Sequence, residues 1–228
     1  MAGSIRICLI AEGFTEDLIT CISAITRNTQ TPITVYANGK SNWISLDQFD
    51  PNQVSLIQEK NPLGWGNVTN YFLNNLTEQY LVVMDPSTVF NADPIPQTLA
   101  ALDSGYQGVG WKGGLVNIDD EWRTTTDKGV GEVDVLFSYY MAIDREFALA
   151  AGGANPSAKY YRNADLELSL AIRQSGGKLL QIDLPLEQGR HHGYHDVDPE
   201  YRDKNSRKNY QRILDRFRGK NEILSPRR

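Results

Sequence analysis

Alternating apolar runs and amphipathic stretches organise the first part of the chain. Residues 5–11 form a nearly continuous run of β-favouring apolar residues, as expected for a strand buried on both faces. Apolar positions spaced four and three apart then predict a helix over residues 16–28. A second β-rich run at 33–36 stops at Asn38-Gly39, a turn signal. This pattern predicts a strand–helix–strand unit, whose crossover makes the two strands parallel.

The rest of the chain continues this alternation less regularly. Residues 105–131 are rich in glycine and tryptophan with little periodicity, which predicts short strands and a loop. Residues 133–143 are predicted to form one long strand. We therefore expect one α/β domain, with a mixed but mainly parallel sheet flanked by helices. The other predicted elements are strands at 54–57, 80–84 and 178–182, and helices that end at 76 or span 93–102, 165–174 and 201–217. The strands at 5–11, 33–36, 54–57 and 80–84 are expected to be neighbours.

Composition agrees with this picture. The chain has 228 residues, of which 40% are hydrophobic and 22% charged, so it suits one globular domain and is short for two. No apolar run is long enough to span a bilayer. Cys8 and Cys21 lie in apolar surroundings, which predicts reduced core residues rather than a disulfide or zinc site. The first ten residues lack the pattern of a secretory signal, so a cytoplasmic location is expected.

The charge is unevenly distributed along the chain. Residues 198–228 contain ten basic and five acidic side chains, whereas residues 1–197 contain 13 basic and 23 acidic ones. An acidic body argues against binding nucleic acid, because phosphate contacts need a basic surface. The basic C-terminal segment is either a solvated helix or a peripheral contact with an anionic membrane or a phosphorylated acceptor. We therefore divide the chain at 197.

Three polar clusters occupy places where an open parallel sheet binds ligands. Asp85 ends the apolar run at 80–84, where a carboxylate either holds a divalent cation or ribose hydroxyl, or forms a turn before proline. Asp165 and Glu167 lie near the start of a predicted helix, so they either carry chemistry or stabilise the helix N-terminus. Residues 191–196 contain all three histidines, a pattern suited to binding a metal or phosphate.

Taken in order, these segments resemble the inverting GT-A glycosyltransferases of family 2, and the resemblance covers most of the chain. The similar segments are the glycine-containing loop at 61–70 (NPLGWGNVTN), the DxD-type segment at 81–89 (LVVMDPSTV), the Gly-Gly turn at 152–156 (GGANP), the ED-type helix start at 164–168 (ADLEL) and the terminal HHG at 191–193.

This resemblance implies a fold and an activity. The expected fold is the GT-A, or nucleotide-diphospho-sugar transferase, fold in a single domain. Its nucleotide-binding half would span about residues 1–92 and its acceptor half about 93–197. The expected activity is transfer of a sugar from a nucleotide-diphosphate donor to a hydroxyl acceptor, with inversion, in glycan or polysaccharide biosynthesis.

The resemblance also assigns roles to residues. Asp165 falls on the catalytic base, which takes the proton from the acceptor hydroxyl. Asp85 and His191 would hold a divalent cation, Mn²⁺ or Mg²⁺, which stabilises the leaving diphosphate. The nucleotide sugar is expected at Ala11, Glu12, Gly13, Asn38, Asn67, Asn70, Asp85 and Ser87, and the acceptor beside Trp111, Gly153 and Glu167.

Four positions depart from the family pattern. Ser87 replaces the second aspartate of the DxD motif, which removes a carboxylate from the cation site. Ala37, Gly13 and Ala164 replace an aspartate, an asparagine and an acidic residue. A weakly active or non-catalytic sugar-nucleotide-binding relative is therefore the alternative. A nucleotidyltransferase is a third reading, but residues 11–15 lack the basic residue that its phosphate loop needs.

Overall fold

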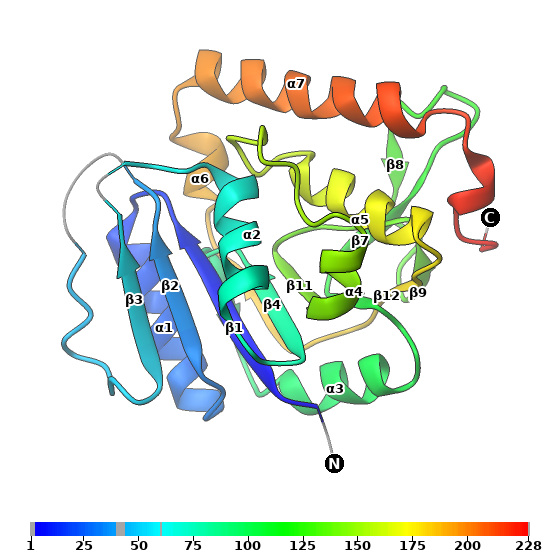
Figure 1. Ribbon diagram of the computed structural model, residues 1–228. Helices are drawn as coiled ribbons and strands as arrows, with labels where there is room; N and C mark the ends of the chain where they lie inside the picture. The colour runs from blue at the N-terminus through cyan, green and yellow to red at the C-terminus, as the bar shows by residue number, and fades with distance from the viewer. Residues whose placement is uncertain (1–2, 40–43, 60, 228) are drawn as a thin grey trace.

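The structure is a computed structural model that describes residues 3–39, 44–59 and 61–227. Its centre is an eight-stranded sheet in the order β3-β2-β1-β4-β11-β6-β12-β9 (Figure 1). Six strands run in one direction, while β11 and β9 run antiparallel to their neighbours. The predicted neighbours β3, β2, β1 and β4 are thereby confirmed. The strands are β1 (Ile5–Ala11), β2 (Ile33–Ala37), β3 (Val54–Gln58), β4 (Tyr80–Met84), β6 (Gly108–Gly110), β9 (Gly131–Val133), β11 (Tyr140–Asp144) and β12 (Leu179–Gln181).

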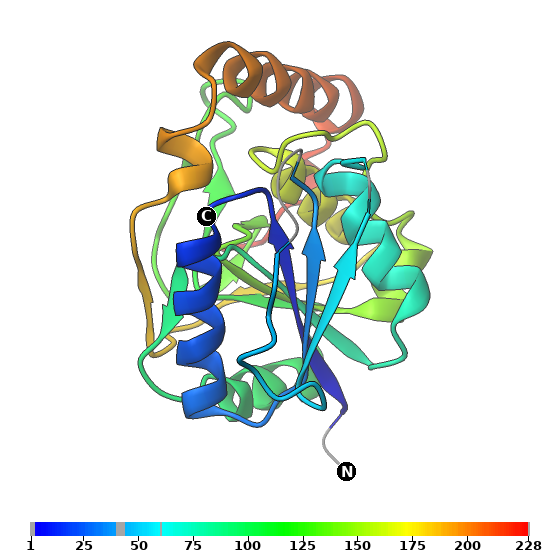
Figure 2. The ribbon, with the colours of Figure 1, turned by 90° about the vertical axis from the view of Figure 1, so that its left-hand side faces the viewer.

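Helices cover both faces of this sheet, as predicted. Figure 2 shows the first strands between α1 on one side and α2 on the other. The side chains of β4 alternate between the two faces: Val82 packs into the apolar cluster beneath α1, and Val83 into the cluster beneath α2. Both faces are therefore core, which explains the unbroken apolar runs in the sequence. The helices are α1 (Thr15–Asn28) and α3 (Ile95–Asp103) on one face, and α2 (Trp65–Asn75), α4 (Arg145–Ala150) and α5 (Ala164–Gln174) on the other.

The predicted long strand at 133–143 is wrong. The chain forms β9, then β10 (Val135–Leu136) in a separate three-stranded sheet, and then β11. Side chains distant in sequence take the backbone hydrogen bonds that a neighbouring strand would otherwise take: Ser169 Oγ accepts from Leu136 N–H (3.0 Å), and Asp165 accepts from Ser138 N–H (2.9 Å). The run is β-favouring throughout, but its partners change twice.

The remaining elements lie at the sides and top of the sheet. β5 (Thr88–Phe90) pairs with β13 (Leu186–Gln188), and β7 (Gly113–Val116) and β8 (Thr125–Thr126) complete the sheet of β10. The short helix α6 (His192–His195) and the long helix α7 (Pro199–Phe217) lie at the top in Figure 1, followed by a 3₁₀ turn (Asn221–Ile223). Helix α7 packs on α5, and both supply side chains to a third apolar cluster.

Two further sequence expectations concern burial. Cys8 and Cys21 are buried free thiols in the core, as predicted. Across the described ranges, the helices lack the combination of length and apolarity needed to cross a bilayer.

Candidate active site

Asp85 stands at the carboxyl end of the buried strand β4. Its Oδ1 accepts hydrogen bonds from the backbone N–H of Ser87 (2.8 Å) and from the Ser87 hydroxyl. Its Oδ2 lies 3.4 Å from Nε2 of His191. Ser87, which replaces the expected second carboxylate, therefore fixes one oxygen of Asp85 and leaves the other facing the histidine.

His191 is held by aromatic rings as well as by Asp85. The ring of Tyr161 stacks on the imidazole with 4.9 Å between centroids, and Tyr139 meets it edge-on at 5.6 Å. Only 8% of His191 is exposed. The imidazole is thereby fixed in a defined orientation beside the carboxylate. The sequence predicted the Asp85–His191 pair but not the two tyrosines.

Asp85 and His191 together could supply two ligands to a cation, which would take its other ligands from the substrate and water. A carboxylate oxygen and an imidazole nitrogen are both ligands for Mn²⁺. Within residues 3–39, 44–59 and 61–227, however, no group of three or more His, Cys, Asp or Glu side chains forms a metal site. A cation held by Asp85 and His191 would thus need diphosphate oxygens and water to complete its coordination, as is common for Mg²⁺ with phosphate substrates.

Asp165 lies in the first turn of α5 and is 4% exposed. Its Oδ2 accepts from the backbone N–H (2.9 Å) and the hydroxyl (3.1 Å) of Ser138, and its Oδ1 accepts from Leu166 N–H (2.9 Å). Burial raises the pKa of Asp165 to about 6, although these donors favour the ionised form. A carboxyl group with this pKa is suited to act as a general base near neutral pH.

Ser138 joins the backbone of Asp85 to the carboxylate of Asp165. Its carbonyl accepts from the backbone N–H of Asp85 (2.9 Å), while its own N–H and hydroxyl donate to Asp165. Asp85 and Asp165, 80 positions apart in sequence, are therefore separated by a single residue in space. Ser138 lies in the break between β10 and β11, and its polarity within an apolar run is the only sequence signal for it.

Two cavities meet at this point, and Ser138 and Tyr161 line both. The first, which we call the Glu12 cavity, lies at the carboxyl ends of β1 and β4. Its polar and aromatic lining includes Glu12, Gly13, Phe14, Asp17, Trp65, Asp85 and Ser87. The second, the Asp165 cavity, has a volume of about 650 Å³. Its polar lining includes Ser138, Arg162, Asn163, Asp165, Gln188, Arg190, His191 and His195.

The carboxyl group of Glu12 has a pKa close to neutral pH. Burial raises its pKa to about 7, with a smaller contribution from the charge of Asp85, while a hydrogen bond from Asn38 Nδ2 (2.9 Å) opposes the shift. Asn38 also accepts from the N–H groups of Leu63 (2.8 Å) and Gly64 (3.1 Å). Asn38 therefore ties Glu12 to the loop before α2. Ala11, the predicted residue just before Glu12, is fully buried at the end of β1.

Asn67 and Asn70 lie on α2 and line neither cavity. Asn67 Nδ2 donates to the carbonyls of Leu63 (3.1 Å) and Pro156 (3.2 Å). Asn70 exchanges two hydrogen bonds of 2.8 Å with the backbone of Ala154. A Cβ on Gly153, which has φ +68°, would lie 2.5 Å from Asn70 Oδ1. These hydrogen bonds tie α2 to the Gly-Gly turn.

The remaining predicted acceptor residues also lie outside both cavities. Glu167 is 2% exposed and binds Arg212 of α7 (2.8 Å) and Asn155 (2.7 Å). Trp111 packs on the core cluster beneath α1, and Lys112 Nζ lies 4.8 Å from its ring centroid. In contrast, the structure brings Asp85, Ser87, Asp165 and His191 together.

Comparisons with known proteins agree with the fold. The sequence matches no protein-family model and no curated protein. The structure is similar to that of GalNAc-T7 with UDP, GalNAc and Mn²⁺ (14% identity, TM-score 0.68), covering 94% of this chain and 48% of that one. It is also similar to the mannosyltransferase PcManGT from Pyrobaculum calidifontis in complex with GDP-Man and Mn²⁺ (12% identity, TM-score 0.60), covering 80% and 55%. A third similar structure is S. aureus TarS 1–349 (9% identity, TM-score 0.61), covering 96% and 74%.

The chain therefore has the GT-A fold, as the sequence predicted. It spans about half the length of the first two of these chains.

Proposed function

We propose that the protein is an inverting glycosyltransferase of the family 2 type, which moves a sugar from a nucleotide-diphosphate donor to a hydroxyl acceptor. The observation that carries this proposal is the junction at Ser138. There, a buried carboxylate of raised pKa lies one residue away from the Asp85–His191 pair, with a cavity on each side. A general base and a diphosphate-binding group are the two elements that a single displacement needs.

The donor would bind in the Glu12 cavity, at the carboxyl ends of β1 and β4. Ligands of open α/β sheets bind at this edge. Among residues 3–39, 44–59 and 61–227, the charged side chains that line this cavity are those of Glu12, Asp17 and Asp85. A diphosphate is repelled by such a lining unless a cation is present. Asp85 and His191 would hold Mn²⁺ or Mg²⁺, which would neutralise negative charge on the leaving diphosphate.

The acceptor hydroxyl would lie in the Asp165 cavity. In its ionised form Asp165 accepts the hydroxyl proton as the oxygen attacks the anomeric carbon, and the donor's carbon–oxygen bond to the diphosphate breaks. Ser138 holds the carboxylate by two hydrogen bonds and so fixes the direction of proton transfer. GalNAc-T7 and PcManGT, whose structures contain a nucleotide or nucleotide sugar with Mn²⁺, support the binding of a nucleotide-sugar donor and a cation by this fold.

Paired variants test the two roles. A thermal-shift screen with UDP, GDP and dTDP, with and without Mn²⁺, first identifies the donor base. Asp165→Asn should then lower turnover about 10²–10⁴-fold with donor binding unchanged. Asp85→Asn should instead weaken Mn²⁺-dependent donor binding about tenfold or more. Asp144→Asn is the matched control, because Asp144 caps α4 and asparagine caps equally well.

Two results would contradict the proposal. Turnover within a few-fold of wild type in Asp165→Asn would remove the general base. The second result is that the wild-type protein binds donor but shows no turnover with any of a broad panel of acceptors. That result would favour the alternative, a non-catalytic sugar-nucleotide-binding relative. The replacement of a metal-site carboxylate by Ser87 is the reason for considering this alternative.

A further inference from the structure

The two cavities differ in the charged residues that line them. Within the part of the chain that the structure describes, the charged side chains that line the Glu12 cavity are all carboxylates. Of the residues that the structure describes, Arg162, Arg190, His191 and His195 line the Asp165 cavity, and Asp165 is the one carboxylate among them. These arginines occur in a protein whose net charge is −5. A cavity with such a lining favours an anionic ligand.

Of the two arginines that line this cavity, Arg190 has a carboxylate partner, whereas Arg162 has none among the described residues. The guanidinium of Arg190 is paired with Asp196 (2.6 Å and 3.0 Å). Arg162 instead stacks over the ring of Tyr194, 5.0 Å from its centroid. Among the residues that the structure describes, no carboxylate lies within ion-pair distance of Arg162. Its guanidinium is therefore available to an anionic ligand.

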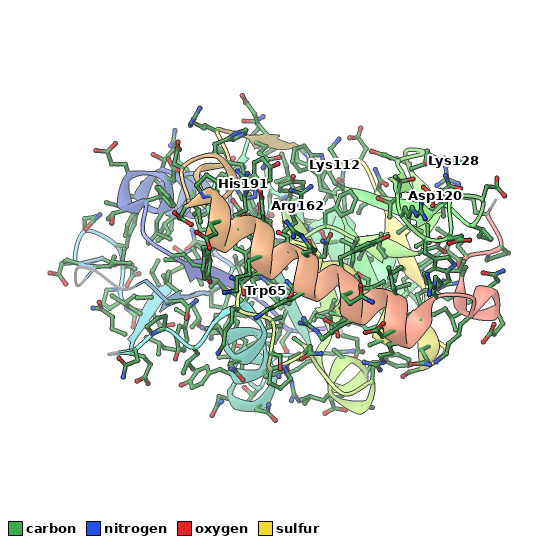
Figure 3. All side chains as sticks on the ribbon, turned by 90° about the horizontal axis from the view of Figure 1, so that it is seen from above. Trp65, Lys112, Asp120, Lys128, Arg162 and His191 are labelled. Carbon is green, nitrogen blue, oxygen red and sulfur yellow. The ribbon has the colours of Figure 1, made fainter. Side chains whose placement is uncertain are left out.

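The backbone that carries Arg162 is fixed by the terminal helix. Asn209 of α7, which is 1% exposed, donates to the carbonyls of Tyr160 (2.8 Å) and Arg162 (2.9 Å). Asn163 donates to the carbonyl of Ser206, also on α7 (3.1 Å). Seen from above, Arg162 and His191 lie on the same side of α7 (Figure 3). Helix α7 therefore positions Arg162 beside the Asp165 cavity.

The Asp165 cavity also continues past Arg162. Arg162, Asn163, Leu166 and Thr125 line a neighbouring cavity of about 310 Å³ as well. The far wall of this cavity is mainly apolar and includes Val116, Trp122, Val135, Leu170 and Ile213. The space available to an acceptor is thus longer than one sugar ring, and Arg162 lies where its two parts meet.

We propose that Arg162 binds a phosphate group of the acceptor, so that the acceptor is an alcohol bearing a phosphate near its reactive hydroxyl. This inference rests on the proposed function, in which the hydroxyl lies at Asp165. A guanidinium binds phosphate oxygens through two parallel hydrogen bonds, which fixes orientation as well as supplying charge. The phosphate belongs either to a soluble phosphodiester or to a lipid headgroup.

Calorimetry with three probes tests the inference. The probes are glycerol, glycerophosphoglycerol, and dihexanoyl phosphatidylglycerol dispersed as monomers. The wild-type protein should bind the phosphodiesters more tightly than glycerol. Arg162→Gln should weaken that binding about tenfold to a hundredfold, and Arg162→Lys should weaken it less. Arg207→Gln is the matched control, because Arg207 is exposed on α7 and lines neither the Asp165 cavity nor its extension.

The probes also separate the two phosphate sources. Tighter binding of the lipid than of glycerophosphoglycerol assigns the phosphate to a lipid, and equal or weaker binding assigns it to a soluble acceptor. The inference is overturned if wild type binds glycerophosphoglycerol no more tightly than glycerol, or if Arg162→Gln leaves phosphodiester affinity unchanged. Calorimetry measures binding without turnover, so the role of Arg162 can be decided even if Asp165 proves not to be the general base. Arg162 is exposed, so unchanged thermal unfolding of both variants is expected.

Discussion

Asp165 and Glu167 belong to the same turn of α5 but face different surroundings. Side chains two positions apart point to different sides of a helix. Asp165 therefore meets Ser138 at the cavity wall, while Glu167 meets Arg212 of α7. Both are buried acids in one helix turn, and the sequence offered both as site residues. Their partners, which come from opposite sides of α5, give them different roles.

The raised pKa of Asp165 predicts a pH-dependent stability. The folded state holds the proton up to about pH 6, whereas the unfolded chain releases it near pH 4. This contribution to stability is thus fully present below pH 4 and is lost as pH rises through 6. Between pH 4 and 7 the wild-type protein should lose about 2–3 kcal/mol relative to Asp165→Asn.

Urea unfolding of both proteins over this pH range measures the difference. Glu12, whose pKa is raised to about 7, titrates in both proteins, so its contribution cancels. Stability curves that stay parallel from pH 4 to 7 would contradict the environment described for Asp165.

At the scale of elements, the contact between α5 and α7 combines an apolar cluster with a buried ion pair. Leu170 of α5 and Ile213 and Phe217 of α7 share the cluster. Glu167, whose side chain is 3% exposed, accepts three hydrogen bonds from Nε and Nη2 of Arg212 (2.8 Å, 3.0 Å and 3.3 Å). The helix predicted as a basic terminal segment thus uses one of its arginines internally.

Removal of Arg212 should therefore be costly. Arg212→Met leaves a buried carboxylate with Asn155 as its remaining side-chain donor, and should lower the free energy of unfolding by about 3–5 kcal/mol. Urea denaturation measures this change. Adding Glu167→Gln to the same chain should recover part of the loss, because the buried charge is then gone. Arg207→Met, at an exposed position of α7, should change stability by less than about 0.5 kcal/mol. An equal effect of the two methionine variants would refute the role of the pair.

At the scale of the whole molecule, the segment after residue 197 closes one side of the core. It contributes buried Ile213, Phe217, Ile223 and Leu224 to the third apolar cluster. It also fixes the backbone at Arg162 through Asn209. The acceptor side of the proposed site therefore depends on residues 198–228, the segment whose basic composition distinguishes it from the rest of the sequence.

A chain that ends at residue 197 should consequently lose cooperative unfolding. Truncation exposes the apolar wall beneath α7 and leaves Glu167 without Arg212. Urea titration followed by near-ultraviolet circular dichroism should show a broad, early transition for the truncated chain and a single sharp one for the full chain. The same midpoint in both would show that α7 is separable from the domain.

Much of this architecture could be predicted from the sequence alone. The first four strands and their helices were recognisable because periodicity and turn residues act over a few positions. Asp85 stood out because it follows an apolar run, Asp165 because it lies near the start of a predicted helix, and His191 because all three histidines cluster there. By contrast, α4 was not predicted, although Asp144 caps its first turn, because it is only six residues long and follows β11 directly.

What only the tertiary structure decided was the choice of partners. Residues 133–143 have the composition of one strand, yet Ser138 donates to Asp165 and Leu136 donates to Ser169, each about 30 positions away. The packing of these distant segments places Ser138 between Asp85 and Asp165, and it brings Glu167 against Arg212. A local pattern sets conformation and the face that is buried, whereas a hydrogen bond between distant segments depends on how the whole chain packs.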